Sequence, residues 1–134
     1  MGNRAVIAFE KQGKRDKKSV GIYLHWNGGR DSVEGFLEAA KRYGVRGGDS
    51  SYCVARLAQI IGNTFGGTLS VGVGIVENLD CDNYDNGLYW VNNDFEIVGR
   101  EFNRGKEQKE YKLEEFVAHV KEANDIHFQS KEAA

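Results

Sequence analysis

The short segment Tyr-Leu-His-Trp-Asn-Gly-Gly, residues 23–29, gathers the side chains of this chain that are best suited to hold a ligand. Histidine can donate or accept hydrogen bonds, and tryptophan offers a large apolar ring with a single donor. Asparagine and glycine tolerate positive φ, so Asn27 and the glycines after it also form a natural turn. Between a strand end and a helix start, this turn would present His25, Asn27 and main-chain amides to a carboxylate or phosphate.

The same segment also has a purely structural interpretation. Trp26 would then pack on the core and His25 would hydrogen-bond to the main chain, as such side chains near strand ends often do. In the binding interpretation, Tyr23 and Arg30 join His25, Trp26 and Asn27 in a contact surface. The sequence leaves both interpretations open.

Cys53 is the residue best placed to act as a nucleophile, because it lies near the start of a predicted helix, where the dipole lowers a thiol pKa. Residues 47–53, Gly-Gly-Asp-Ser-Ser-Tyr-Cys, resemble the helix-start cysteine of papain-like hydrolases, whose histidine follows on a strand. Here His119 and His127 fall on or just after a predicted helix, and only His25 lies on a strand. We therefore predict that Cys53 is a core thiol. A small hydrolase using His25 with Cys53 is the alternative.

Negative charge is concentrated in residues 77–96, which carry six carboxylates and no lysine or arginine. Residues 1–18 hold six basic and two acidic side chains, although the net charge of the whole chain is only −2. We interpret Asp80, Asp82 and Asp85 as part of a surface that attracts a basic partner and repels nucleic acid. A solvated acidic turn is the plainer alternative.

The acidic loop does not have the spacing of an EF-hand. Counted from Asp80, position 5 is Tyr84 and position 12 is Val91, where the motif needs an oxygen ligand and a glutamate. Carboxylate and amide oxygens still suit hard cations, so an irregular cation site on this loop is left open. We predict no dedicated metal site and no cofactor.

Glycine-rich and basic segments do not indicate a nucleotide or nucleic-acid site. Residues 62–74 contain neither Gly-x-Gly-x-x-Gly nor a Lys-Ser/Thr pair between a strand and a helix, which excludes the usual phosphate loops. The basic residues of 11–18 would neutralise few phosphates. With a pI of about 5.9, direct nucleic-acid binding is not expected.

The chain of 134 residues, 40% of them hydrophobic, fits one α+β domain over residues 1–134. No apolar run approaches the ~18 residues needed to cross a bilayer, and the first apolar stretch is too short for a secretory signal. Cys53 and Cys81 are too few for a disulfide framework. We therefore expect a cytoplasmic protein with reduced thiols and no membrane contact.

Five stretches have the β-branched content or the alternation of strands: residues 4–10, 20–26, 68–77, 87–92 and 95–102. We expect the first two to pair antiparallel, and the last two to form a hairpin that turns at Asn93-Asp94. Glycine alternates with apolar residues in the third stretch, which implies close approach of another segment on its glycine face.

Three helices are predicted, at residues 31–43, about 51–61 and 111–124, the first capped by Asp31 with Glu34. The predicted element order is ββ-αα-βββ-α, an α+β fold with an antiparallel sheet of about five strands. Apolar residues at helical spacing are expected to pack against the glycine-alternating strand. This predicted core comprises Val33, Phe36, Leu37, Val54, Leu57, Ile61, Phe116, Val117 and Val120 against Val71, Val73 and Ile75.

The turn segment resembles a signature of small uncharacterised proteins of phages and other mobile elements. They carry Tyr-x-His-(Trp/Tyr)-(Asp/Asn)-Gly after a strand, which Tyr23, His25, Trp26, Asn27 and Gly28 match here. The following helix often contains Leu-Leu or Phe-Leu, matched by residues 36–37, whereas Gly-Tyr-Pro is replaced by residues 28–30, Gly-Gly-Arg. The resemblance covers residues 20–43 and implies a mobile-element accessory protein, without an enzymatic activity.

Because no complete catalytic set is present, we predict a binding protein rather than an enzyme. The resemblance implies that it acts by occupying a host protein, for example as an anti-defence inhibitor of the anti-CRISPR kind. The expected contact surface combines the turn with the acidic segment, so the expected partner is a host protein with a basic surface. The sequence does not determine the oligomeric state.

Overall fold

The first strand, β1 (Ala5–Phe9), lies in the middle of a five-stranded sheet. In the computed structural model, which describes residues 3–66, 69–104 and 111–128, the strand order is β3-β2-β1-β4-β5. The other strands are β2 (Val20–Leu24), β3 (Val71–Ile75), β4 (Leu88–Val91) and β5 (Ile97–Glu101). The predicted α+β class and element order are confirmed. One pairing differs from the predicted antiparallel sheet, because β1 and β4 run parallel.

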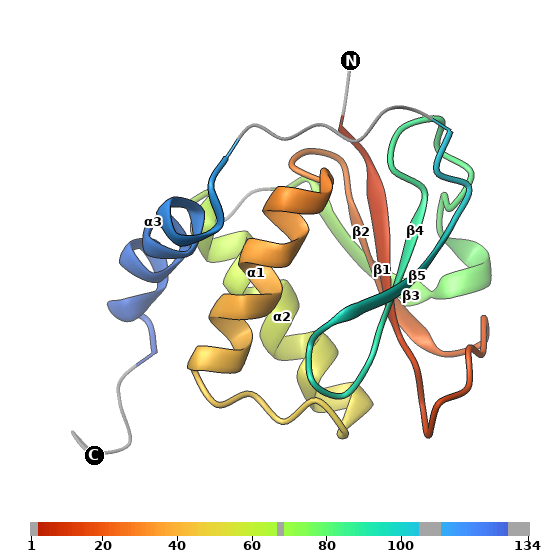
Figure 1. The fold of residues 1–134 in the computed structure, drawn as a ribbon, viewed down its shortest axis with the longest axis horizontal. Helices are drawn as coiled ribbons and strands as arrows, with labels where there is room; N and C mark the ends of the chain where they lie inside the picture. The colour runs from red at the N-terminus through yellow and green to blue at the C-terminus, as the bar shows by residue number, and fades with distance from the viewer. Residues whose placement is uncertain (1–2, 67–68, 105–110, 129–134) are drawn as a thin grey trace.

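The parallel pair follows from the path of the chain after β3. The hairpin of β1 and β2 occupies one side of β1, and β3 adds to the outer side of β2. A short 3-10 turn (Val76–Asn78) and the segment after it then carry the chain across the sheet to the open side of β1. These residues lie on one side of the sheet, and the helices lie on the other (Figure 1).

The three helices are α1 (Arg30–Arg42), α2 (Ser50–Thr64) and α3 (Leu113–Asp125). All nine helical residues predicted for the core are buried, because a stripe at helical spacing must face the sheet or a neighbouring helix. The cap prediction is wrong: α1 begins at Arg30, after Gly29. Asp31 lies in the first turn, where its Oδ2 accepts a hydrogen bond from the Tyr111 amide and so holds the start of α3.

The predicted strand partner of this core is right only for Val71, which packs against the core cluster, and wrong for Val73 and Ile75. The helices pack against the inner strands, whose buried residues on that face include Ile7, Ile22 and Tyr89. In contrast, β3 forms the edge of the sheet, and Val73 is 55% exposed there. Alternation shows that one face of a strand is apolar, but it does not show whether the strand lies at the centre or at the edge.

A second buried cluster, which the sequence analysis did not predict, covers the face away from the helices. It is formed by Val6, Ala8, Val76, Leu88 and Trp90. The Trp90 ring is fully buried, and its Nε1 donates to Glu101 Oε2 at 2.6 Å, so its one polar group is satisfied. The closeness of this layer explains why glycine stands at position 21, where a Cβ would lie 2.8 Å from Val76 Cγ2.

Truncation of a core leucine should test this arrangement. Leu57→Ala removes a fully buried side chain, so we expect the free energy of unfolding to fall by about 2–5 kcal/mol through lost transfer energy and a residual cavity. Leu69→Ala is the matched control, because Leu69 is fully exposed and its truncation should cost almost nothing. Urea denaturation measures both values, and equal losses would contradict the fold.

Candidate functional site

The turn after β2 is fixed to the start of β1 by main-chain hydrogen bonds. The amide of Asn3 donates to the His25 carbonyl at 3.0 Å, and the Gly28 amide donates to the Asn3 carbonyl at 2.7 Å. On the other side, the His25 amide donates to the Ser70 carbonyl at 3.1 Å. The buried Tyr89 hydroxyl also donates to the Gly28 carbonyl at 2.8 Å. The backbone that carries the predicted site residues is therefore held from three directions.

The residue types of the turn follow from this close packing. Asn27 has φ of 57°, in the left-handed region that asparagine tolerates better than most residues. A Cβ on Gly28 would lie 2.6 Å from Ala5 Cβ and 2.6 Å from the Asn3 carbonyl oxygen. Any other residue at position 28 would push the turn away from β1. The turn composition is therefore explained by packing, as the structural interpretation required.

Tyr23 and His25 lie on the sheet face away from the helices, because residues two apart on a strand share a face. Their side chains are joined by a hydrogen bond of 3.0 Å between the Tyr23 hydroxyl and His25 Nδ1. The His25 ring also contacts the Trp26 ring edge-to-face, with 4.8 Å between the ring centroids. These contacts orient His25 and brace the tryptophan.

Arg4 connects the Tyr23–His25 pair to the acidic segment. Its Nε lies 2.9 Å from Asp85 Oδ2, its amide donates to the same oxygen at 3.1 Å, and its Nη1 lies 3.8 Å from Asp80 Oδ2. Burial raises the pKa of the Tyr23 hydroxyl, and Asp80 and Asp85 raise it further against the opposing effect of Arg4. Three predicted site residues, Tyr23, Asp80 and Asp85, therefore lie around one guanidinium group, and His25 is joined to them by its hydrogen bond with Tyr23.

Asp85 remains ionised in this cluster. Its partial burial would raise the pKa of the carboxyl, but the hydrogen bonds from the Arg4 side chain and amide outweigh that effect and hold the pKa below its ordinary value. The nearby His25 contributes in the same direction. Asp85 consequently acts as a structural anion that fastens the start of β1 to the loop before β4.

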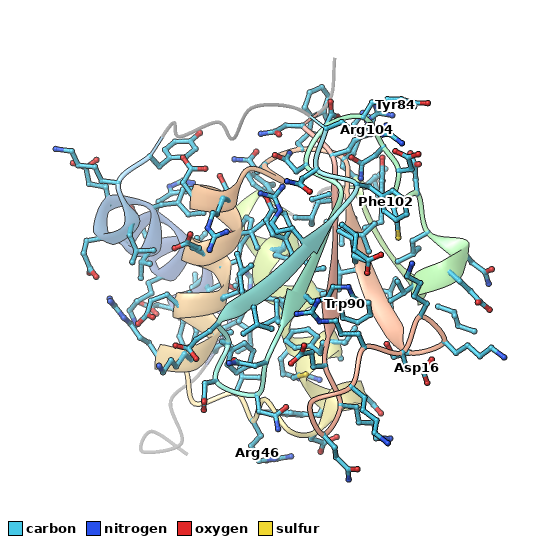
Figure 2. All side chains as sticks on the ribbon, turned by 45° about the vertical axis from the view of Figure 1, so that its right-hand side comes forward. Asp16, Arg46, Tyr84, Trp90, Phe102 and Arg104 are labelled. Atoms are coloured by element: carbon cyan, nitrogen blue, oxygen red, sulfur yellow. The ribbon has the colours of Figure 1, made fainter. Side chains whose placement is uncertain are left out.

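Asp82 has a separate partner. Its two carboxylate oxygens accept hydrogen bonds of 2.5 Å and 2.8 Å from Arg104, which keep the pKa of Asp82 below its ordinary value. The same guanidinium lies 5.3 Å from the centre of the Tyr84 ring, and the two side chains lie together near one end of the sheet (Figure 2). The acidic segment thus receives counter-charges from Arg4 and Arg104, both outside residues 77–96. Charge counting along the sequence did not indicate this compensation.

Trp26 points toward the helix side, where it remains 47% exposed. It borders a hollow of about 320 Å³ that is also lined by Asn27, Ile61, Phe65, Ser70 and Val71. A second hollow of about 290 Å³ shares Asn27 and Phe65 with the first and extends to Tyr111, Glu115, Phe116 and His119. We call the two together the Trp26 groove. Trp26 is therefore not the fully buried core residue that the structural interpretation required.

Sequence reasoning missed the residues that α2 and α3 contribute to this groove. Phe65 follows the last turn of α2, and His119 lies within α3. The helical stripes identified the residues that face the core, but Phe65 and His119 lie at the margin of those stripes. No short motif links them to residues 23–29, because they are brought together only by helix packing.

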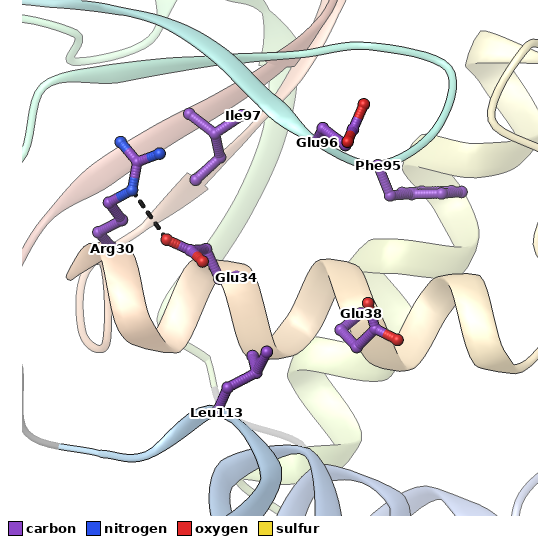
Figure 3. Close-up of a pocket in the computed structure, with 7 residues that line it drawn as sticks. All are labelled: Arg30, Glu34, Glu38, Phe95, Glu96, Ile97 and Leu113. Carbon is purple, nitrogen blue, oxygen red and sulfur yellow. Dashed lines mark hydrogen bonds and ion pairs between the residues drawn. The ribbon is translucent and has the colours of Figure 1, made fainter.

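Arg30 belongs to a different surface from the rest of the turn. Its Nε donates to Glu34 Oε1 at 2.8 Å across one helical turn. Both residues line a hollow of about 270 Å³ between α1, the β4–β5 hairpin and the start of α3 (Figure 3). Its other lining residues are Glu38, Phe95, Glu96, Ile97 and Leu113. The structure does not place Arg30 in the Trp26 groove.

Cys53 and His25 are not brought together. Cys53 is fully buried near the start of α2, with its Sγ 3.7 Å from the Gly47 carbonyl oxygen. Burial is the main cause, and the negative charge of Asp49 the second, that raises the pKa of its thiol to about 11. His25 lines neither hollow of the groove, and its neighbour Trp26 meets α2 at the other end, beside Ile61. At ~1.5 Å of rise per residue, Cys53 and Ile61 are about 12 Å apart along the helix axis.

The described part of the chain contains neither a cluster of metal ligands nor a membrane-spanning helix. Within residues 3–66, 69–104 and 111–128, no group of three or more His, Cys, Asp or Glu side chains is arranged to hold a metal ion. Over the same ranges, none of the helices combines the length and the apolar character that crossing a membrane requires.

The thiol of Cys53 should be inert in the native protein. In a Cys81→Ser variant, which leaves Cys53 as the sole cysteine, iodoacetamide should react at neutral pH roughly a hundredfold or more slowly than with an exposed thiol. The cause is the small thiolate population together with burial. Labelling followed by mass spectrometry gives the rate, and addition of urea should accelerate it. Rapid native labelling would instead support the hydrolase alternative.

Removal of the Asp85 carboxylate should destabilise the protein. Asp85→Ala deletes two charge-assisted hydrogen bonds to Arg4, so the free energy of unfolding should fall by about 1–3 kcal/mol. Because the pKa of Asp85 is lowered in the fold, its contribution is complete above the ordinary value of 3.8 and is lost as the pH falls through the folded pKa. Thermal unfolding between pH 3 and 7 measures both effects.

Asp82→Ala is the matched control for this experiment. Its ion pair with Arg104 is more exposed to solvent, so its loss should destabilise the protein much less than loss of the Asp85 carboxylate. Equal destabilisation by the two substitutions would show that Asp85 has no special structural role.

Comparison of the chain with protein-family models, with curated proteins and with solved structures found no match in any of the three. The resemblance of residues 23–28 to mobile-element proteins is therefore neither supported nor contradicted by these comparisons. Function must be inferred from the contacts within the chain.

Proposed function

We propose that this protein acts by binding and occupying a partner protein, and that the Trp26 groove is its main contact surface. The observation that carries the proposal is the exposed Trp26, held over an apolar hollow by a turn that is fixed from three directions. Tryptophan is among the residues most enriched at the energetic centres of protein interfaces. A large aromatic ring that is half-exposed and packed against a neighbouring ring suits such a centre.

Rigidity of the turn supports the proposal. Binding costs conformational entropy when loops and side chains become ordered, and a surface that is ordered beforehand avoids part of this cost. Here the main chain of residues 25–28 is hydrogen-bonded to Asn3, Ser70 and Tyr89, and the Trp26 ring rests against His25. The turn can therefore present Trp26 to a partner without first becoming ordered.

The lining of the groove indicates what it would accept. Its floor is formed by Ile61, Phe65 and Val71, which favour an aliphatic or aromatic side chain of the partner. Asn27, Glu115 and His119 add polar groups within or beside the hollow. An apolar residue flanked by polar ones is the corresponding feature of a partner surface.

The acidic segment contributes less to the proposal than the sequence analysis expected. Asp80 and Asp85 are bound by Arg4, and Asp82 is bound by Arg104, so their attraction for a basic surface is reduced at short range. A basic patch on the partner would at most adjust the rate of encounter. We therefore assign recognition mainly to the Trp26 groove.

The biological setting of the proposal comes from the resemblance alone. The signature at residues 23–28 favours an accessory protein of a mobile element, whose partner would be a host protein, including a component of host defence. A hydrolase that uses His25 with Cys53 is the weaker alternative, because the thiol is buried near the start of α2, whereas Trp26, the residue after His25, lies beside Ile61 near the end of that helix.

Partner binding should depend on Trp26. The tagged protein is used to recover a partner from lysate of the native host, the partner is identified by mass spectrometry and purified, and its affinity is measured by calorimetry. Trp26→Ala should weaken binding by at least about tenfold, since truncation of a central aromatic residue typically costs more than ~1–2 kcal/mol. Because Trp26 is half-exposed, the variant should retain its fold, which circular dichroism checks.

Tyr84→Ala serves as the matched control, because Tyr84 is an exposed aromatic residue of the acidic loop rather than of the groove. Its truncation should leave the affinity within about twofold of the wild-type value. Loss of binding in Tyr84→Ala together with retention in Trp26→Ala would move recognition to the acidic loop and overturn the assignment to the groove.

A further inference from the structure

Within residues 3–66, 69–104 and 111–128, the edge strand β3 has a row of main-chain groups without a partner strand. At one end of β3, the Val76 amide donates to the Ser19 carbonyl, and at the other end the Ser70 carbonyl accepts from the His25 amide. Val76 and Ser70 therefore direct their main-chain groups toward β2. Main-chain groups alternate in direction along an antiparallel strand. Gly72 and Gly74 therefore also face β2, whereas Val71, Val73 and Ile75 direct their amides and carbonyls away from the sheet. In the described part of the chain, no strand lies beyond β3.

The opposite edge of the sheet is protected. Strand β5 contains Arg100 and Glu101, and its pairing with β4 is interrupted by an irregularity beside Trp90 and Val91. In addition, the Arg15 guanidinium donates to the Val98 carbonyl at 3.0 Å. Charged residues, bulges and covering side chains are the usual means by which proteins prevent an edge from pairing with another strand. Strand β3, with the sequence Val-Gly-Val-Gly-Ile, has neither charge nor proline.

The side chains of β3 form a nearly symmetric pattern about Val73. Val71, Val73 and Ile75 lie on the helix side of the sheet, because they pair with Leu24, Ile22 and Val20 in register. Val73, Ile75 and Val20 are 40–55% exposed there. The other face carries only Gly72 and Gly74. When the strand is reversed about Val73, an apolar residue meets an apolar residue at each position and glycine meets glycine.

We propose that a second copy of this chain pairs with β3 across a two-fold axis, so that the two sheets become continuous. Val73 then lies opposite Val73 of the second copy, and Val71 lies opposite Ile75. Because these are the residues whose main-chain groups point outward, the pairing forms about six hydrogen bonds between the chains. The same register covers the exposed valine and isoleucine side chains with their symmetry mates.

The geometry of the helices permits this pairing. Helix α2 packs against β2 and β3, so two to three strand spacings would separate the α2 helices of the two copies. At ~4.8 Å for each spacing, the two helices lie about 10–14 Å apart. Direct helix contact occurs at ~8–10 Å, so the helices approach without overlap. The net charge of −2 per chain adds little repulsion.

A five-residue edge with one row of side chains is a small contact. Stable interfaces usually bury about 800 Å² on each partner, and an edge of this length buries less. The dimer is therefore expected to exchange with the monomer and to depend on protein concentration. The contact does not use Trp26, but it shares Val71 with the floor of the Trp26 groove. Its test measures the mass of the purified chain without any partner, so its failure is distinguishable from failure of the function proposed above.

The mass in solution tests the proposal. Sedimentation of the untagged chain over a hundredfold range of concentration should show the mass rising from 15.0 kDa toward twice that value. Val73→Lys places two ammonium groups opposite each other at the axis, so this variant should remain at the mass of one chain throughout. Val98→Lys, the same substitution at an exposed position of the opposite edge, should behave like the wild-type protein.

Cysteine cross-linking tests the register, in a Cys81→Ser background with Cys53 left buried. Under mild oxidation, Val73→Cys should form a disulfide-linked dimer, because the two positions face each other at the axis. Val71→Cys should not, because its symmetry mate lies four residues along the strand, about 13 Å away. Equal cross-linking of both variants, or a wild-type mass of one chain at all concentrations, would overturn the proposal. In the latter case, β3 would be left as an edge for the strand of another protein.

Discussion

The central position of β1 determines how the rest of the structure is arranged. The strand is fully buried on both faces, between the antiparallel β2 and the parallel β4. Because β4 must reach the open side of β1, the segment after β3 crosses the second face of the sheet and covers Val6 and Ala8. The same crossing brings the loop before β4 to the start of β1, where Arg4 binds Asp85 and the Val6 amide donates to Gly87.

The start of β1 in turn fixes the turn that carries the candidate site. Asn3 exchanges hydrogen bonds with His25 and Gly28, and Tyr89 of β4 adds another. The main chain is therefore held without help from the side chain of Trp26, which stays half-exposed over the groove. Separation of these roles explains how a turn whose composition is dictated by packing can still present a binding residue.

The two edges of the sheet differ for a physical reason that bears on association. Strand β5 carries charge, an irregular pairing and the covering Arg15, each of which discourages another strand. On the helix side of β3, Val71 packs against the core, whereas the apolar Val73 is left exposed. Its glycines allow Leu79 to approach the other face, where a Cβ on Gly74 would lie 3.3 Å from Leu79 Cδ2. An edge strand that is close-packed on one face and exposes apolar side chains on the other is suited to pair with a strand of another chain.

The sequence by itself determined the features that depend on neighbouring residues. Helical spacing identified the buried stripes around Phe36, Leu57 and Phe116, and turn chemistry located the bend after β2. Only the tertiary structure decided the strand order, the exposure of Trp26 and the pairing of Arg4 with Asp85. Periodicity reports which face of an element is apolar, whereas contacts between residues 81 positions apart depend on where the chain crosses the sheet. That path is set by the combined packing of all the elements, and no single segment encodes it.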